Sequence, residues 1–273
     1  MTGKSIPILT YHEVNVSVQG FNKCNRMDPA TCLSVEEFSD QMSYLSQNKF
    51  STISLKNVLE GRDDLSDFSC NNRRIAITFD DGHIGNFKFV LPILKKYGFS
   101  TTFFIATDFI GKENMMSWSD LEEMVKEGME VQSHAISHKP LSLLTNEQLV
   151  DELSGSKKTL EHNLGVKVDF LSLPHGDYDR RIGLIAKDVG YQAIFTSEPK
   201  YFLKNKQRNN FLIGRIEIKK GCSSNYYISI VNGKFDKIMC LRLTYKLKSI
   251  LRSFIGVENY RRLYRLFNGI KVN

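Results

Sequence analysis

The segment Ile75-Ala76-Ile77-Thr78-Phe79-Asp80-Asp81-Gly82 decides the fold. Its apolar and β-branched residues predict a short buried strand that ends in two adjacent carboxylates and a glycine. In parallel α/β architectures the carboxyl ends of the strands carry the chemistry. Two neighbouring aspartates at such an end repel each other unless a cation or a proton lies between them. The segment therefore indicates a metal site, with an ordinary Asp-Gly turn as the alternative.

Strand-like and helical segments alternate along most of the chain. Strands are predicted to begin near residues 6, 75, 101, 129, 170, 192 and 212, which makes seven. Helices are predicted between most of them, at 34–48, 86–97, 119–126, 145–164 and 180–187, from capping boxes, helical spacing and terminal glycines. Pro92 predicts a kink or a late start in one of them. This alternation indicates parallel βαβ units, arranged either as an open sheet or as a closed barrel.

The composition is that of a globular protein with an apolar core. The chain has 273 residues, of which 41% are hydrophobic, enough for one large α/β domain or two small ones. Neither a signal-peptide core nor a membrane span is indicated by any apolar run. The five cysteines form no Cys-x-x-Cys pair, which favours a reducing cytoplasm, with a Cys24–Cys32 disulfide as the alternative.

A second polar group follows another predicted strand. In His134-Ala135-Ile136-Ser137-His138 two imidazoles lie four residues apart directly after the strand at 129–133. A helical turn would let both reach one cation. The spacing alone is a weak signal, but a parallel array would place it at the same rim as the two aspartates. Two histidines and a carboxylate leave room for water, as in hydrolytic metal sites.

Three segments, in their order along the chain, resemble the polysaccharide deacetylase family, carbohydrate esterase family four. They are Thr78-Phe79-Asp80-Asp81-Gly82, Ser133-His134-Ala135-Ile136-Ser137-His138 and Pro174-His175-Gly176. Leu9-Thr10-Tyr11-His12 and Trp118 supply similar context, and the resemblance covers about residues 6–218. It implies a distorted seven-stranded (β/α) barrel, an α/β fold that agrees with the strand count above.

The resemblance also implies roles for individual residues. Asp80 would be the general base, and a divalent metal, usually zinc, would be held by Asp81, His134 and His138. The metal would acidify a water and polarise the acetamide carbonyl while Asp80 takes the proton of the water. The loop Pro174-His175-Gly176 would contact the substrate and donate a backbone N–H to the oxyanion.

Two departures from the family pattern leave roles to fill. The family often carries arginine two residues before the proline of the third motif, where this chain has Ser172. Arg215, on the last predicted strand, is the candidate for orienting Asp80, with a surface ion pair as the alternative. The late catalytic histidine of the family is also absent, because no histidine follows His175. We expect His12 to act as general acid, with His175 second, although a histidine at a strand end is often only hydrogen-bonded.

Two aromatic residues are candidates for substrate binding. Trp118 and Tyr178 would form a sugar platform, because aromatic faces stack on pyranose rings, and packing in the barrel is the alternative for each. His83 and His162 are expected to face solvent or to pack.

The net charge of +7 is concentrated at the C-terminal end. Residues 237–273 hold nine Lys or Arg and one acidic residue, against 28 basic and 29 acidic residues in 1–236. The pattern predicts a catalytic barrel, 1–236, followed by two basic amphipathic helices. Their apolar faces fit an anionic membrane surface, a protein partner or the barrel itself. No nucleic-acid motif accompanies the charge, so we expect no nucleic-acid partner.

The sequence therefore predicts a metal-dependent hydrolase that removes N-acetyl groups from amino sugars such as N-acetylglucosamine. We expect the substrate to be a surface polysaccharide or its lipid- or nucleotide-linked precursor, met in the cytoplasm or at the inner face of the membrane. An amidase acting on a non-sugar C–N bond and a catalytically silent carbohydrate-binding relative are the alternatives. The like-charge pair Asp80-Asp81 disfavours the silent relative, because a binding module does not need it.

Overall fold

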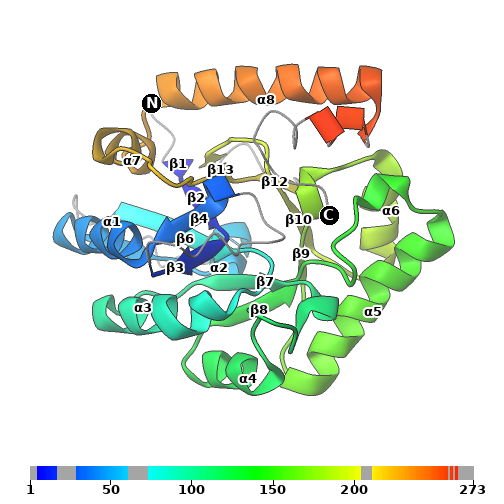
Figure 1. Ribbon diagram of the computed structural model, residues 1–273, viewed down its shortest axis with the longest axis horizontal. Coiled ribbons are helices and arrows are strands. Elements are labelled where there is room, and N and C mark those ends of the chain that lie inside the picture. The colour runs from blue at the N-terminus through cyan, green and yellow to red at the C-terminus, as the bar shows by residue number, and fades with distance from the viewer. Residues whose placement is uncertain are drawn as a thin grey trace.

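A nearly closed parallel sheet forms the centre of the protein, and helices pack outside it (Figure 1). The computed structural model describes residues 5–16, 29–60, 73–203, 211–257, 259–260 and 262–263. The strand order is β12-β10-β9-β8-β7-β6-β2-β13, with β5 paired to β6. The strands span β2 Ile8–Tyr11, β5 Phe50–Thr52, β6 Arg73–Phe79, β7 Thr102–Ile105, β8 Glu130–Ser133, β9 Phe170–Ser172, β10 Ala193–Thr196, β12 Leu212–Gly214 and β13 Ile216–Glu217.

One segment near the end of the sheet nearly closes it into a barrel. β12 and β13 are two halves of residues 212–217, separated by Arg215. β12 pairs with β10 and β13 pairs with β2, so this closing segment joins the two ends of the sheet. Counted with the closing segment as one strand and without β5, the barrel has seven strands. The predicted seven-stranded α/β barrel is confirmed.

The barrel is distorted between β8 and β9. A single residue pair, Ser133 with Leu171, links these two strands. The side chain of Gln132 supplies the missing bonds, because its Oε1 accepts from the N–H groups of Asp169 and Phe170 at 2.9 and 2.8 Å. A side-chain amide thus satisfies backbone donors that a regular ladder would pair.

The interior of the barrel is apolar at one end and polar at the other. Alternation along β6 places Ala76, Thr78 and Asp80 on one face. Ala76 belongs to a buried cluster with Phe104 and Phe195, whereas Thr78 hydrogen-bonds Thr10 on the neighbouring strand β2. The polar layer therefore lies toward the carboxyl ends of the strands, where the two aspartates follow β6.

Among the outer helices, those predicted at 34–48, 119–126, 145–164 and 180–187 form close to the predicted boundaries. The outer helices are α1 Val35–Gln47, α2 Leu55–Glu60, α3 Leu91–Tyr97, α4 Trp118–Lys126, α5 Asn146–Leu164, α6 Arg180–Val189, α7 Ser224–Val231 and α8 Phe235–Ile255. The capping boxes at Ser34 and Thr145 are both present, and Gly165 ends α5 in the left-handed conformation. The interruption predicted at Pro92 is a π-helical turn, Asn86–Val90, ahead of α3. A proline has no N–H for the helical ladder, so the chain widens there.

Two short pairs of strands complete the described elements. β1 Ser5–Ile6 pairs antiparallel with β11 Phe202–Leu203, and β3 Glu13–Asn15 pairs with β4 Cys32–Ser34. Cys24, and with it the alternative of a Cys24–Cys32 disulfide, lies outside the described residues.

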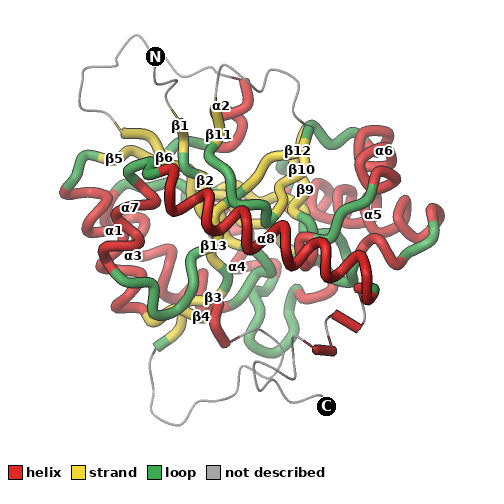
Figure 2. The backbone as a smooth tube through the Cα atoms, turned by 90° about the horizontal axis from the view of Figure 1, so that it is seen from above, coloured by secondary structure: helices red, strands yellow, loops and turns green. Residues whose placement is uncertain are grey.

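The basic C-terminal region begins with a long helix that ends at Gly256, where the two predicted helices divide. The described residues after it, at 257, 259–260 and 262–263, are helical as well, and the rest of the second predicted helix lies outside the described residues. α8 begins two residues before the predicted boundary at 236/237 and crosses the outside of the barrel (Figure 2). Among the described residues, no helix combines the length and the apolar character that crossing a bilayer requires.

Candidate active site

The two adjacent carboxylates separate because the backbone changes conformation between them. Asp80 still continues the strand, since its N–H donates to Tyr11 O at 3.0 Å. Asp81 has φ 76° and Gly82 has φ 97°, both in the left-handed region. Such a conformation costs a non-glycine residue about 1–3 kcal/mol and is concentrated at functional sites. The strained turn directs the two carboxylates to different partners.

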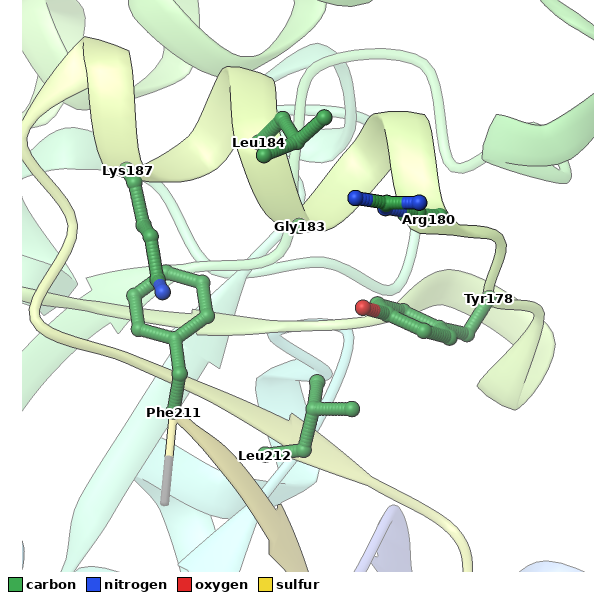
Figure 3. Close-up of a pocket in the computed structure, with 7 residues that line it drawn as sticks. All are labelled: Tyr178, Arg180, Gly183, Leu184, Lys187, Phe211 and Leu212. Atoms are coloured by element: carbon green, nitrogen blue, oxygen red, sulfur yellow. The ribbon is translucent and has the colours of Figure 1, made fainter. Parts of the chain in front are cut away.

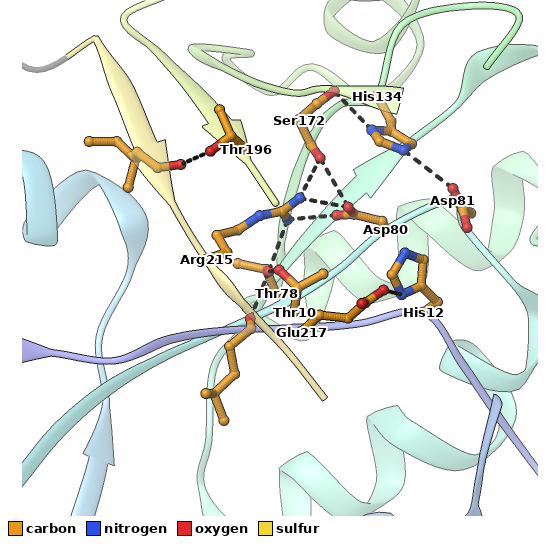
Figure 4. Close-up of polar contacts among 12 residues, drawn as sticks. Thr10, His12, Thr78, Asp80, Asp81, His134, Ser172, Thr196, Arg215 and Glu217 are labelled. Atoms are coloured by element: carbon orange, nitrogen blue, oxygen red, sulfur yellow. Dashed lines mark hydrogen bonds and ion pairs between the residues drawn. The ribbon is translucent and has the colours of Figure 1, made fainter. Parts of the chain in front are cut away.

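Asp80 forms a buried pair with Arg215 (Figure 4). Both guanidinium Nη atoms donate to the carboxylate, Nη1 to Oδ1 and Nη2 to Oδ2, each at 2.7 Å. Ser172 completes the network: its Oγ accepts from Arg215 at 2.7 Å and donates to Asp80 at 3.0 Å. Arg215 is 1% exposed and Asp80 4%, so the surface ion pair considered for Arg215 is not what forms.

The network keeps Asp80 ionised. Burial raises the pKa of the carboxyl, but the charge of Arg215, with smaller contributions from His134 and His12, outweighs it, and the pKa of Asp80 lies below its ordinary value. Each oxygen of this carboxylate accepts a charge-assisted hydrogen bond, which fixes its orientation as well as its charge. The carboxylate is therefore ionised and able to accept a proton. Both of its oxygens already accept hydrogen bonds from Arg215, so it is less available to a metal than Asp81.

Asp81 faces the two histidines instead. Its Oδ1 lies 3.3 Å from Nε2 of His134 and 2.9 Å from Nε2 of His138. One potential ligand atom from each of the three residues lies within 4.8 Å of the others. Asp81 Oδ1 is buried and has no hydrogen bond of acceptable geometry within the described structure. A buried carboxylate oxygen without such a bond, facing two imidazole nitrogens, fits a cation that all three residues share.

The tautomer of His134 also suits a metal ligand. Its Nδ1 lies 2.9 Å from the carbonyl oxygen of Ser172. A carbonyl can only accept, so Nδ1 carries the proton and, in the neutral ring, Nε2 presents its lone pair toward Asp81.

Asp81 and His134 shift each other's acidity in the protein without metal. Burial opposes the charged form of each group, yet the imidazoles of His138, His134 and His83 bring the pKa of Asp81 well below its ordinary value. For His134 the charges of Asp80 and Asp81 outweigh burial and raise the pKa of the imidazole. The surroundings of Asp81 and His134 thus favour a positive charge at this position.

The two histidines converge without the helical turn that their spacing suggested. Ala135 and His138 instead adopt left-handed backbone conformations, with φ 61° and 56°. Glu152, on α5, holds this loop, because its Oε2 accepts from the N–H groups of Ile136 and Ser137, both at 2.9 Å. Sequence reasoning missed Glu152, since a glutamate in a helix reads as a surface residue.

His83 is packed in the interior rather than facing solvent, the second of the two expected environments. It is only 4% exposed, and its Nε2 lies 3.7 Å from Asp81 Oδ2. Burial lowers the pKa of the imidazole, but Asp81 and Glu13 outweigh burial and the pKa lies above its ordinary value. The strained turn at Asp81 and Gly82 brings His83 back toward the carboxylate, and no local sequence pattern encodes that reversal.

The two candidates for general acid lie on different loops at this rim. His12 directly follows β2, and its Nδ1 is 4.0 Å from Glu217 Oε1. Its charge contributes to the low pKa of Asp80, so it is within electrostatic reach of the base. His175 is exposed and lies against a candidate ligand, with its ring centroid 4.6 Å from that of His138.

A carboxylate joins the two loops that carry His138 and His175. Asp177, next to the turn Pro174–Gly176, accepts hydrogen bonds from the N–H and Oγ of Ser142, in the loop after His138. Gly176 is required in that turn, because its φ is 62° and a Cβ would lie 2.8 Å from Ser197 Oγ. The hydrogen bonds between Asp177 and Ser142 therefore fix the loops after β8 and β9 relative to each other.

The aromatic candidates have other surroundings. Tyr178 lines a groove between α6 and the start of β12, together with Leu184, Phe211 and Leu212 (Figure 3). Trp118 is the first residue of α4 and packs, half-buried, against the hydrophobic core. Packing, the alternative weighed for both rings, thus describes Trp118 better than Tyr178, which is 39% exposed.

The rim of this parallel (β/α) barrel thus carries two separated carboxylates, one paired with an arginine and one facing two histidines. Residues 69–194 match the family model described as polysaccharide deacetylase. Over these residues the chain resembles the polysaccharide deacetylase family, as the sequence motifs indicated.

Individual relatives agree with this assignment. The YxkH protein of Bacillus subtilis is 28% identical over 224 residues, which are 81% of this chain and 74% of YxkH. The poly-β-1,6-N-acetyl-D-glucosamine N-deacetylase of Staphylococcus aureus is 28% identical over 200 residues, 68% of this chain and 67% of that protein. The structure of the Streptococcus pyogenes deacetylase PplD, in complex with acetate, has the same fold, with a TM-score of 0.73 at 22% identity over 84% of this chain and 99% of PplD.

Proposed function

We propose that this protein is a metal-dependent hydrolase that removes N-acetyl groups from amino sugars of a surface polysaccharide or of its lipid- or nucleotide-linked precursor. The observation that carries the proposal is the division of two adjacent carboxylates between two partners. Asp80 is held by Arg215, whereas Asp81 faces His134 and His138. The relative named as a poly-β-1,6-N-acetyl-D-glucosamine N-deacetylase supports an N-acetylglucosamine polymer as the substrate class.

The residues present fit a divalent cation. Two imidazoles and one carboxylate are a ligand set of hydrolytic zinc sites, and a buried Asp81 oxygen lacking a good hydrogen bond supports binding there. When bound, the cation would lower the pKa of a water and polarise the acetamide carbonyl.

The protein's own side chains would move the protons. Asp80 accepts a proton from the water as its oxygen attacks the acetamide carbon. Arg215 keeps Asp80 ionised and oriented while this happens. His12 gives a proton to the sugar nitrogen as the C–N bond breaks, which releases acetate and the free amine, and His175 is the second candidate for this role.

A backbone donor would stabilise the oxyanion. We assign this role to a backbone N–H of the turn Pro174-His175-Gly176. Trp118 and Tyr178 stay proposals for contacts with more distant sugar units.

The decisive test is acetate release by the zinc-loaded protein from N-acetylglucosamine oligomers and from lipid- and nucleotide-linked N-acetyl sugars. We expect release that disappears in Asp80→Asn, which keeps the shape of the side chain but cannot accept the proton. Tight metal binding without release from any sugar would favour an amidase with a different amide substrate. Neither metal binding nor release would favour a silent carbohydrate-binding relative.

His12 has a separate test. His12→Ala should lower kcat by about 10²–10⁴-fold, the usual contribution of a general acid, and leave the zinc content at its wild-type value. An unchanged kcat would exclude His12 and direct attention to His175→Ala.

The site of action also stays a proposal. The cysteine usage supports the cytoplasm, where the substrate would be a biosynthetic precursor rather than a finished polymer. Cell fractionation with an antibody to the protein tests this, and recovery outside the cytoplasmic membrane would contradict it.

A further inference from the structure

The side of α8 that faces away from the barrel carries a continuous apolar stripe. Its members recur at helical spacing and are between 48% and 84% exposed: Met239, Leu243, Leu247, Ile250, Leu251 and Phe254. The helix has 21 residues, so the stripe runs along a rod of about 31 Å at 1.5 Å per residue. Large apolar side chains scattered singly on a surface need no explanation, whereas a contiguous row marks a binding surface.

The barrel does not cover this stripe, because α8 is attached through its other side. Ile238 is 4% exposed and Leu241 packs against the core. Arg242 and Arg252 of the same side reach Glu198 and Asp177, with nitrogen–oxygen distances of 3.4 and 3.9 Å. Packing of the tail on the barrel therefore accounts for one side of α8 and leaves the stripe exposed. Figure 1 shows the helix along the outer edge of the molecule.

The charged residues beside the stripe indicate which kind of partner fits it. At 100° per residue, Lys246 flanks one side of the stripe, and Lys237 and Lys248 lie beyond its other side. Asp236 is the sole acidic residue in α8, against five Lys or Arg. Pairing two copies of α8 through their stripes would bring the lysines of both copies together, which is unfavourable. Anionic headgroups would neutralise them instead, and an apolar stripe bordered by lysines is the pattern of helices that lie in a membrane interface.

We propose that the outer face of α8 docks on an anionic lipid surface, with the stripe in the boundary between headgroups and acyl chains and the lysines at the phosphates. The attachment of Arg252 to Asp177 lies beside the turn Pro174–Gly176. Docking would thus hold the carboxyl-end rim of the barrel at a fixed distance from the bilayer.

The test is flotation of the full chain with vesicles of phosphatidylglycerol and phosphatidylcholine, and with vesicles of phosphatidylcholine alone. We expect binding to the anionic vesicles that weakens with added salt, and much weaker binding to the neutral ones. The variant Leu247→Gln/Phe254→Gln should reduce the bound fraction about tenfold or more, because affinity follows the buried apolar area. Val150→Gln/Leu184→Gln is the matched control, since both of its residues are exposed apolar side chains on other helices, and it should bind as the wild type does.

Other outcomes overturn the proposal. Equal binding of the two double variants would show that the stripe is not the docking surface, and absence of binding by the wild type would show that there is none. Light scattering on the same samples separates self-association: a wild-type dimer that Leu247→Gln/Phe254→Gln converts to a monomer would assign the stripe to a second copy. These readouts do not depend on catalysis, so they stand whether or not acetate release is observed.

Discussion

At the scale of single residues, the site depends on Arg215, whose guanidinium replaces the arginine that the family usually carries on another strand. Ser172 occupies the position of the usual arginine, and its hydroxyl accepts a hydrogen bond from Arg215, which comes from the closing segment, two strands away from β9. The hydroxyl then hydrogen-bonds both members of the ion pair. Ser172 and Arg215 therefore act together in place of the usual arginine.

Removal of the guanidinium should destabilise the fold as well as the reaction. Arg215→Met leaves the buried carboxylate of Asp80 without its partner, and breaking a buried pair costs about 3–5 kcal/mol. Urea denaturation of Arg215→Met, Asp80→Asn and the double variant measures this as a cycle. We expect the double variant to lose less free energy of unfolding than the sum of the single variants. Additive losses, or a loss below about 1 kcal/mol for Arg215→Met, would contradict the pairing.

At the scale of elements, the loop after β8 depends on a helix that sequence reasoning did not connect to it. Glu152 of α5 bonds two successive N–H groups of that loop, and Ser156 of the same helix hydrogen-bonds Ser133 at the end of β8. The helix thus presents a polar face to the segment that carries both candidate histidine ligands.

Removal of the Glu152 carboxylate should weaken metal binding although no metal ligand is removed. Glu152→Ala should lower zinc affinity by about 10–100-fold, the usual effect of losing an outer-shell partner. Competition with a chelating dye measures the affinity. Asp151→Ala removes an exposed carboxylate from the neighbouring position of α5 and is the control. Equal zinc affinity in the two variants would exclude the anchoring role of Glu152.

A carboxyl in β8 gives a prediction of pH dependence. Burial raises the pKa of Glu130, although Thr102 Oγ1 donates to its Oε2 at 2.6 Å. The folded state then binds the proton more tightly than the unfolded state, so the contribution of Glu130 to stability is present at low pH and is lost as pH rises through the folded pKa. Glu130→Gln should gain stability relative to the wild type as pH rises from 4 to 7. Denaturation at both pH values measures this, with the exposed Glu122→Gln as control. A pH-independent difference for Glu130→Gln would contradict the raised pKa.

Local signals explain which elements were predictable. Ser34 and Thr145 bond the backbone three residues away, and Gly165 ends its helix alone, so the sequence around each is sufficient. The meeting of His134 and His138 with the two aspartates was predictable because parallel strands deliver their ends to one rim, whereas the choice of Asp81 came from the family resemblance. The left-handed turns at Ala135 and His138, and the return of His83 toward Asp81, depend on contacts with other elements, and no periodicity encodes them. The pairing of Arg215 was proposed only because a family position lacked its arginine.

At the scale of the whole molecule, the barrel is completed by a segment that approaches its neighbours very closely. Gly214 precedes Arg215, and a Cβ there would lie 2.3 Å from the carbonyl oxygen of Glu198. The backbone of the closing segment must therefore sit directly against the loop after β10.

A methyl group at position 214 should disturb both the closure of the barrel and the active site. Gly214→Ala should lower the free energy of unfolding by about 1–3 kcal/mol, the usual cost of overpacking, and reduce acetate release by displacing the neighbouring Arg215. Gly155→Ala is the comparison, because its Cβ would meet only the flexible end of Ile136. Urea midpoints that are equal in the two variants would contradict the tight approach.

The closing segment also sets the order in which the protein matures. Arg215 follows Asp80 by 135 residues, and contacts between residues so far apart form late, after the intervening loops have been closed. During synthesis, the half of the chain that contains both aspartates leaves the ribosome long before the guanidinium that orients one of them. A nascent chain can thus form most of the barrel without a competent base, and activity begins only when the last strand has joined the first.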